Sequence, residues 1–144
     1  MECPMPTINT NDANEIKKIF EDVKTIAIIG LSPNETKDSN KVGKYLKSVG
    51  YKIIPIYPKE DFILGEKVYR SLSEVPDRVD MVDMFRKPAV ADSLLDEVLK
   101  RDDVKVFWLQ LGIVNNEACK RAKEAGLKVV QNRCSKVEHQ RLMK

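Results

Sequence analysis

The sequence predicts an α/β fold: a single doubly wound domain with a mostly parallel five-stranded sheet and helices on both faces. Short apolar segments alternate along the chain with longer segments whose apolar residues recur at helical spacing. Strands that alternate with helices form a parallel sheet, and right-handed crossovers then cover both of its faces. The length of 144 residues is typical of one domain. Together these observations predict one Rossmann-like domain.

Five segments are predicted as the strands of this sheet. Each is short and mostly apolar, as expected of parallel strands that are buried on both faces. The clearest, residues 104–111, reads VKVFWLQL, whereas the second contains Pro55, which must lie where no ladder donor is needed. A further short strand is expected around Val68 and Tyr69, with a turn of helix near Ser73. The five predicted strands are residues 25–30, 52–57, 79–85, 104–111 and 127–130.

Apolar residues at helical spacing predict helices before, between and after these strands. Asn11 or Asp12 is expected to cap the leading helix, and Ser39 or Asn40 the helix after the first strand. The predicted helices start near residues 13, 39, 88, 115 and 136. Residues 1–12 lack the pattern and are predicted to form an N-terminal arm, so that the domain spans residues 13–144.

Composition excludes several classes of protein. The 25 basic and 22 acidic residues give a formal net charge of +3, which is too small to indicate a nucleic-acid-binding face. No apolar run is long enough to span a bilayer, and the opening segment lacks the pattern of a signal peptide, so no membrane partner is expected. Three cysteines without CxxC spacing indicate neither a disulfide framework nor a zinc site, and they favour a cytoplasmic location.

The binding site of a doubly wound fold lies beyond the carboxyl ends of its strands, where the strand order reverses. Gly30 lets a diphosphate approach the backbone after the first strand, and the following helix start offers N–H groups to the same anion. Ser32 and Ser39 can add hydroxyl donors there, and Lys37 can add positive charge. The strand ends expected to converge are residues 30–32, 57–59, 85–87 and 110–112.

Two features indicate which nucleotide is bound. The GxGxxG fingerprint is absent, since the next glycine after Gly30 is Gly43, which speaks against ordinary NAD binding. The second strand ends on Tyr57, Pro58 and Lys59, without the acidic residue that holds an unphosphorylated ribose. A phosphorylated ribose, as in NADP or coenzyme A, fits this strand end better.

The later strand ends leave alternatives open. Phe85 can stack on an adenine or belong to the core, and Arg86 can bind a phosphate or pair with a nearby carboxylate. Gln110 is a polar residue in an apolar strand and needs a hydrogen-bond partner, which is either the ligand or the backbone. His139, the single histidine, is expected at the surface, and Cys134 is expected to be an inert thiol. No catalytic triad, carboxylate pair or metal-ligand spacing is evident, so catalysis is not expected.

Several segments taken together resemble the stand-alone CoA-binding domain family, which is similar in fold to the CoA-binding domain of the succinyl-CoA synthetase alpha subunit. Two positions depart from the family pattern: Tyr57 stands where asparagine is usual, and Asn132 stands where an acid is usual. The segments that carry the resemblance are GLSPNETKDSNKVGKYLKSVGYKIIPIYP, GEKVYRSLSEVP, VDMVDMFRKP, WLQLGIVNNEACKRAKEAGLKVV and NRCSKVEH.

The resemblance implies that coenzyme A or an acyl-CoA is bound with its diphosphate at the first turn. The phosphate and adenine side would comprise Gly30, Leu31, Ser32, Lys37, Ser39 and Val42. Phe85, Arg86 and Gln110 would form the opposite wall, and Tyr57 and Gly112 complete the expected cofactor-binding set. The expected function is a binding module without chemistry of its own, with a homodimer or a partner enzyme subunit as open alternatives for its partners. The alternative functions are an NADP-binding oxidoreductase-like protein and a protein-interaction domain with a vestigial crevice.

Overall fold

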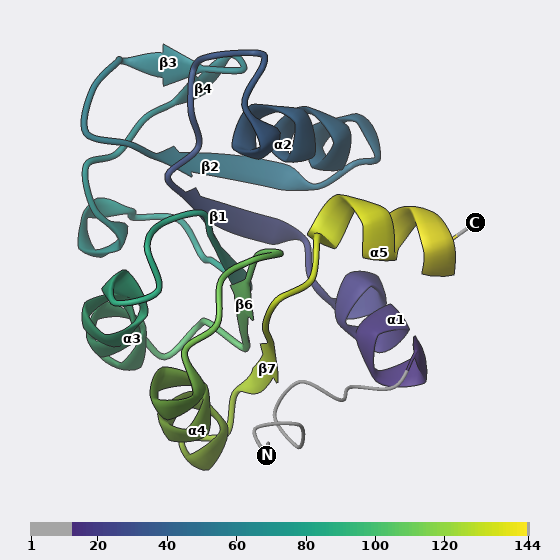
Figure 1. Ribbon diagram of the computed structural model, residues 1–144. Helices are drawn as coiled ribbons and strands as arrows, with labels where there is room; N and C mark the ends of the chain where they lie inside the picture. Colours follow the sequence, from purple (N-terminus) through teal and green to yellow (C-terminus); the bar gives the residue numbers. More distant parts are fainter. Residues whose placement is uncertain (1–12, 144) are drawn as a thin grey trace.

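A five-stranded sheet organises the chain in the computed structural model, which describes residues 13–143 (Figure 1). All neighbouring strands are parallel, in the order β2-β1-β5-β6-β7. The doubly wound α/β fold is therefore confirmed, with each strand one or more residues shorter than predicted. The strands are β1 (Thr25–Ile29), β2 (Lys52–Ile56), β5 (Met81–Met84), β6 (Val106–Leu109) and β7 (Lys128–Val130).

Helices cover both faces of the sheet (Figure 1). The helices α1 (Ala13–Asp22), α2 (Asp38–Ser48) and α5 (Ser135–Leu142) pack on one face, and α3 (Val90–Leu99) and α4 (Asn116–Glu124) pack on the other. Side chains of β1 alternate between the two resulting cores: Ile26 and Ile28 face α1 and α2, whereas Ala27 and Ile29 face α3. Burial on both faces explains why the strand has no polar position after Thr25.

The segment between β2 and β5 contains small elements that the sequence pattern locates only in part. The strand predicted around Val68 and Tyr69 is reduced to one bridge, in which Tyr69 pairs with Ile56. The carbonyl of Pro55 accepts a hydrogen bond from Tyr69 N at 3.0 Å, so the ring nitrogen of this proline also faces away from β1 and costs no ladder bond. A hairpin of β3 (Phe62–Ile63) and β4 (Glu66–Lys67) was not predicted, and the helical turn is η2 (Leu72–Glu74).

The sequence also predicts Asn115 or Asn116 as a helix cap, and this cap is found, whereas the cap expected for α2 is not. Asn115 caps α4, because its side chain accepts a hydrogen bond from Ala118 N at 3.0 Å. The expected cap at Ser39 or Asn40 is wrong, since α2 already begins at Asp38. The expected caps Asn11 and Asp12, like the predicted arm 1–12, lie outside the described residues. None of the described helices is both long enough and apolar enough to cross a membrane.

Candidate functional site

The carboxyl ends of β1 and β5 lie side by side at the point where the strand order reverses. Backbone hydrogen bonds of 2.8 Å continue the pairing past both strands, from Gly30 N to the carbonyl of Ile56 and from Phe85 N to the carbonyl of Ile29. Ligands of doubly wound folds bind beyond this point. The structure thus places Gly30, Phe85 and Arg86 together at the edge where a ligand is expected.

The close approach of Arg86 explains the glycine at position 30. Gly30 has a φ of +87°, and a Cβ on this residue would lie 2.9 Å from both Cδ of Arg86 and the carbonyl oxygen of Phe85. The space that a side chain would occupy is therefore filled by the protein itself. The glycine is required by the fold first, and it also leaves the Gly30 backbone next to the guanidinium.

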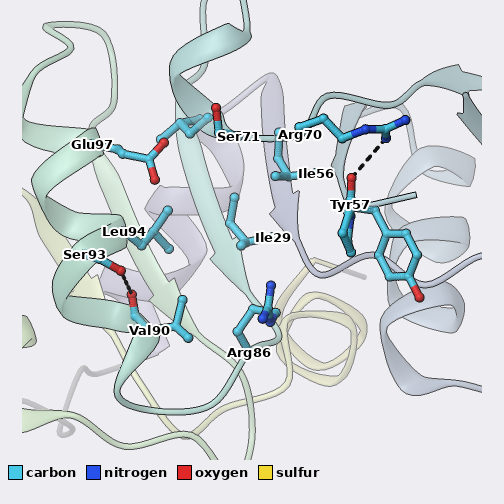
Figure 2. A pocket seen from close by; sticks show the side chains of 12 residues that line it. Ile29, Ile56, Tyr57, Arg70, Ser71, Arg86, Val90, Ser93, Leu94 and Glu97 are labelled. Atoms are coloured by element: carbon cyan, nitrogen blue, oxygen red, sulfur yellow. Dashed lines mark hydrogen bonds between the residues drawn. The ribbon is translucent and has the colours of Figure 1, made fainter. Parts of the chain in front are cut away.

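The Arg86 side chain is exposed, and within residues 13–143 it forms no hydrogen bond or ion pair. The alternative in which Arg86 pairs with a nearby carboxylate therefore does not describe the structure. Figure 2 shows Arg86 at the border of a cavity that Ile29 also lines. A guanidinium without a protein partner at a ligand-binding edge is suited to a phosphate group.

The turn between β1 and α2 is braced by the first turn of the helix. Ser32 N donates to Oγ of Ser39 at 3.0 Å, and Nδ2 of Asn40 donates to the Ser32 carbonyl at 2.9 Å. Ser39 and Asn40, predicted as caps, are buried and hold the turn instead. Leu31 is fully buried in the core beneath α2, so only its backbone can reach a ligand.

The start of α2 presents unpaired backbone donors at the same edge. Lys37 is the N-cap residue, and no side chain makes a capping hydrogen bond there. The first hydrogen bond of the helix runs from Lys41 N to the Lys37 carbonyl at 3.1 Å, so the preceding amides have no partner within the helix. Lys37 and Lys41 are both exposed. This end of α2 can therefore attract an anion through amides, dipole and charge.

A first cavity of about 150 Å³ lies between the ends of β1 and β2 and helix α3 (Figure 2). Its apolar lining includes Ile29, Ile56 and Leu94, and its two cations are Arg70 and Arg86. Of the predicted site residues, Tyr57 and Arg86 line this cavity. The remaining lining residues are Pro58, Ser71, Leu72, Val90, Ser93 and Glu97.

Sequence reasoning missed four polar residues of the first cavity: Arg70, Ser71, Ser93 and Glu97. Arg70 fixes the loop after β2, because its Nη1 donates to the carbonyls of Tyr57, Lys59 and Glu60 at 2.9–3.1 Å. Arg70 directly follows Tyr69, which forms the β-bridge with Ile56. The short strand predicted around Val68 and Tyr69 is therefore the sequence signal from which Arg70 could have been identified. Ser93 and Glu97 belong to α3, where the sequence offers nothing to set them apart from surface residues.

A second cavity of about 370 Å³ lies on the other side of Phe85, between α2 and α5. Three predicted site residues line it, Val42, Phe85 and Gln110. Two further lining residues are apolar and yet exposed, Leu111 at 68% and Val137 at 52%. The other lining residues are Asp38, Lys41, Cys134, Lys136 and Gln140.

The polar group of Gln110 is used inside the protein. Its Nε2 donates to Oδ1 of Asp83 at 2.6 Å and to Oγ of Ser135 at 2.7 Å, and Ser135 Oγ donates to Oδ2 of Asp83 at 2.8 Å. All three side chains are buried. Oε1 of Gln110 also accepts a hydrogen bond from the backbone N–H of Ser135 at 3.4 Å. Gln110 thus has two side chains and a backbone amide as partners, and the network joins β5, the end of β6 and the start of α5. Burial raises the pKa of Asp83 to about 7, although both hydrogen bonds act to lower it.

We expect Asp83 to make stability depend on pH. The pKa of this carboxyl is higher in the folded state than the value of about 3.9 in the unfolded chain. Its contribution to stability is therefore fully present below about pH 4 and is lost as the pH rises through about 7. Thermal unfolding should show the wild type losing more stability between pH 5 and pH 8 than Asp83→Asn. Asp102→Asn, which removes an exposed carboxylate, should keep the wild-type profile; an identical profile for Asp83→Asn would contradict the assignment.

The backbone of Gly112, which lies after β6, is used inside the protein. Its N–H donates to Oδ1 of Asn132 at 2.8 Å, so this amide is already occupied. Gly112 lines neither of the two cavities. Asn132, one of the departures from the family pattern, has a φ of +59° and supplies the acceptor that holds the Gly112 turn.

His139 is a packed residue, and its expected surface position is wrong. Its Nδ1 lies 2.7 Å from the hydroxyl of Tyr45, and its ring contacts Phe20 and Tyr51 at centroid distances of 5.2 and 5.7 Å. Burial lowers the pKa of His139. The residue therefore joins α5 to α1 and α2. Over residues 13–143, the structure contains no cluster of three or more side chains that could hold a metal ion.

The fold and the cavities at its carboxyl edge define a Rossmann-like α/β domain. Comparison with protein families identifies the family of this domain. Residues 24–140 match the family described as the CoA binding domain, and the chain belongs to this family. The resemblance found in the sequence is thereby confirmed over most of the chain.

Individual relatives support the same grouping. The chain is 40% identical over 125 residues to the uncharacterized protein YneT of Bacillus subtilis, covering 87% of this chain and 92% of YneT. A hypothetical protein from Pyrococcus horikoshii superposes with a TM-score of 0.89 at 39% identity, with both chains covered completely. An ADP-forming acetate–CoA ligase of Methanocaldococcus jannaschii is 38% identical over 78 residues, which are 54% of this chain and 11% of the ligase.

Proposed function

We propose that this protein binds coenzyme A or an acyl-CoA through the ADP and diphosphate groups, as a binding module without chemistry of its own. The observation that carries the proposal is the junction of Gly30, Arg86 and the start of α2 at the reversal of strand order. This junction combines close backbone approach, an unpartnered guanidinium and free helix amides. These are the elements with which proteins bind a diphosphate.

The two cavities on either side of this junction fit the two ends of the cofactor. The first cavity offers apolar walls from Ile29, Ile56 and Leu94, suited to the faces of an adenine. Arg70 and Arg86 in its lining can bind the phosphate on the ribose and the diphosphate. Compared with the expected arrangement, the adenine would then lie on the α3 side of the sheet, and the residues of the first turn would hold the diphosphate.

The pantetheine arm would cross Phe85 and enter the second cavity. Phe85 and Arg86 are consecutive residues, and each lines one of the two cavities. An elongated ligand that binds over this pair can therefore occupy both cavities at once. Two titratable groups nearby have protein partners: Asp83 is bonded to Gln110 and Ser135, and His139 lies against the Tyr45 hydroxyl. These partners favour binding over acid–base catalysis by Asp83 or His139.

Calorimetric titration of the purified protein with four ligands tests this function. Coenzyme A should bind most tightly, and dephospho-CoA should bind about 10- to 100-fold more weakly, because a charge-assisted hydrogen bond to the ribose phosphate is lost. NADP and NAD serve as the comparison for the alternative function. Binding of NADP without any response to coenzyme A would reverse the assignment.

A further inference from the structure

The second cavity has more apolar surface than a free coenzyme A needs. Leu111 is the most exposed of the large apolar residues in the described part of the chain, and Val137 is also more than half exposed. Both line this one cavity, Leu111 from the end of β6 and Val137 from α5. Apolar side chains that are exposed together around a cavity commonly mark a binding surface.

Polar and charged residues also line this cavity, among them Asp38, Lys41 and Gln140. The amide of Gln110 is turned toward Asp83 and Ser135, so it leaves no free donor for a ligand in the cavity. The Lys136 ammonium lies 5.9 Å from the centre of the Tyr45 ring, in a cation–π contact. With Val42 and Phe85, the exposed pair therefore forms a wall suited to a hydrocarbon chain.

We infer that the second cavity binds the acyl chain of a CoA thioester, so that the ligand is an apolar acyl-CoA in preference to free coenzyme A. The inference rests on the proposed function, since the nucleotide positions the thioester at Phe85. The cavity has a volume of about 370 Å³, more than twice that of the first one. Burial of the chain against Leu111 and Val137 would supply the preference.

A series of ligands that differ only in chain length measures this preference. Coenzyme A, acetyl-CoA, butyryl-CoA and hexanoyl-CoA are titrated into the full-length protein. Each buried methylene should tighten binding about three- to fourfold until the cavity is filled. Succinyl-CoA, whose chain ends in a carboxylate, should bind more weakly than butyryl-CoA.

Matched variants connect the preference to this cavity. The double variant Leu111→Ser/Val137→Ser should lose the gain with chain length, so that hexanoyl-CoA and coenzyme A bind it with nearly equal affinity, whatever the change in affinity for coenzyme A itself. Both side chains are exposed, and serine has a helix propensity close to that of valine, so the fold should be retained. Val114→Ser is the control, since Val114 is 43% exposed and lies in neither cavity.

The outcomes separate this inference from the proposed function. Equal affinity for coenzyme A and all acyl-CoAs, a stronger response to succinyl-CoA, or a chain-length gain that persists in the double variant would each overturn the acyl site. All three results leave coenzyme A binding in place. Absence of binding for every member of the series would instead overturn the proposed function.

Discussion

Arg86→Ala is expected to weaken coenzyme A binding by about 10- to 100-fold, with almost no change in the melting temperature of the ligand-free protein. The size follows from the net loss of about one charge-assisted hydrogen bond, which contributes about 1.5–3 kcal/mol. The unchanged melting temperature follows because the guanidinium is exposed and has no partner among the described residues. Titration calorimetry and thermal unfolding measure the two effects separately.

Lys87→Ala is the matched control for this experiment. Lys87 is the next residue, carries the same charge and is exposed, but it lines neither cavity. Its loss should change affinity less than about threefold, through the general field alone. Arg86→Lys should fall between the wild type and alanine, since an ammonium cannot make the two parallel bonds of a guanidinium. Equal losses for Arg86→Ala and Lys87→Ala would show that Arg86 makes no specific contact.

Gly30→Ala should be the most destabilising single substitution at the site. Its φ of +87° costs a side-chain-bearing residue about 1–2 kcal/mol, and the added Cβ would also lie 2.9 Å from the Phe85 carbonyl oxygen. A backbone atom cannot move aside without shifting β5. We expect a total loss of roughly 2–4 kcal/mol, seen as a fall in melting temperature of about 5–15 °C.

Gly112→Ala separates the two causes. Gly112 has the same φ of +87°, but a Cβ there would meet no atom within 4 Å. This variant should therefore show only the conformational cost, about half of the loss at Gly30 or less. Denaturant unfolding of both variants gives the comparison. If both variants lose the same stability, the surroundings of Gly30 can yield to a Cβ at no cost. The fold would then not require glycine at position 30 because of Phe85 and Arg86, and the ligand would be the remaining reason for it.

The core of the fold could be predicted because its signals are local. The run TIAIIG has no polar position after its first residue, which is characteristic of a strand buried on both faces, and the structure places it inside the sheet, between β2 and β5. The short hairpin of β3 and β4 escaped prediction, because strands of two residues are too short to show a periodicity. Local signals also misassigned Ser39. A serine at the start of a helix has the same sequence signature whether it caps the helix or reaches back to Ser32.

Only those residues of the candidate site that follow the end of a strand could be predicted from the sequence. Gly30, Arg86 and Tyr57 follow strands, and their places at the carboxyl edge follow from parallel topology. Ser93 and Glu97 lie on a helix face, and only the packing of α3 brings them to the first cavity. The partners of Gln110 are 27 and 25 residues away in sequence, so no local pattern could identify them.

The sequence by itself determined the order of strands and helices, the doubly wound class, the CoA-binding family and the residues that follow each strand. Hydrophobic periodicity and chain chirality act over a few residues, and their effects can therefore be predicted from the sequence without the structure. Only the tertiary structure decided that the Arg86 side chain lies against Gly30 and that His139 packs against Tyr45. It also decided that Arg86 lines one cavity and Phe85 the other. These contacts join residues that are far apart in the sequence. They are set by the close packing of all the elements in the folded protein, so the sequence pattern of one segment does not reveal them.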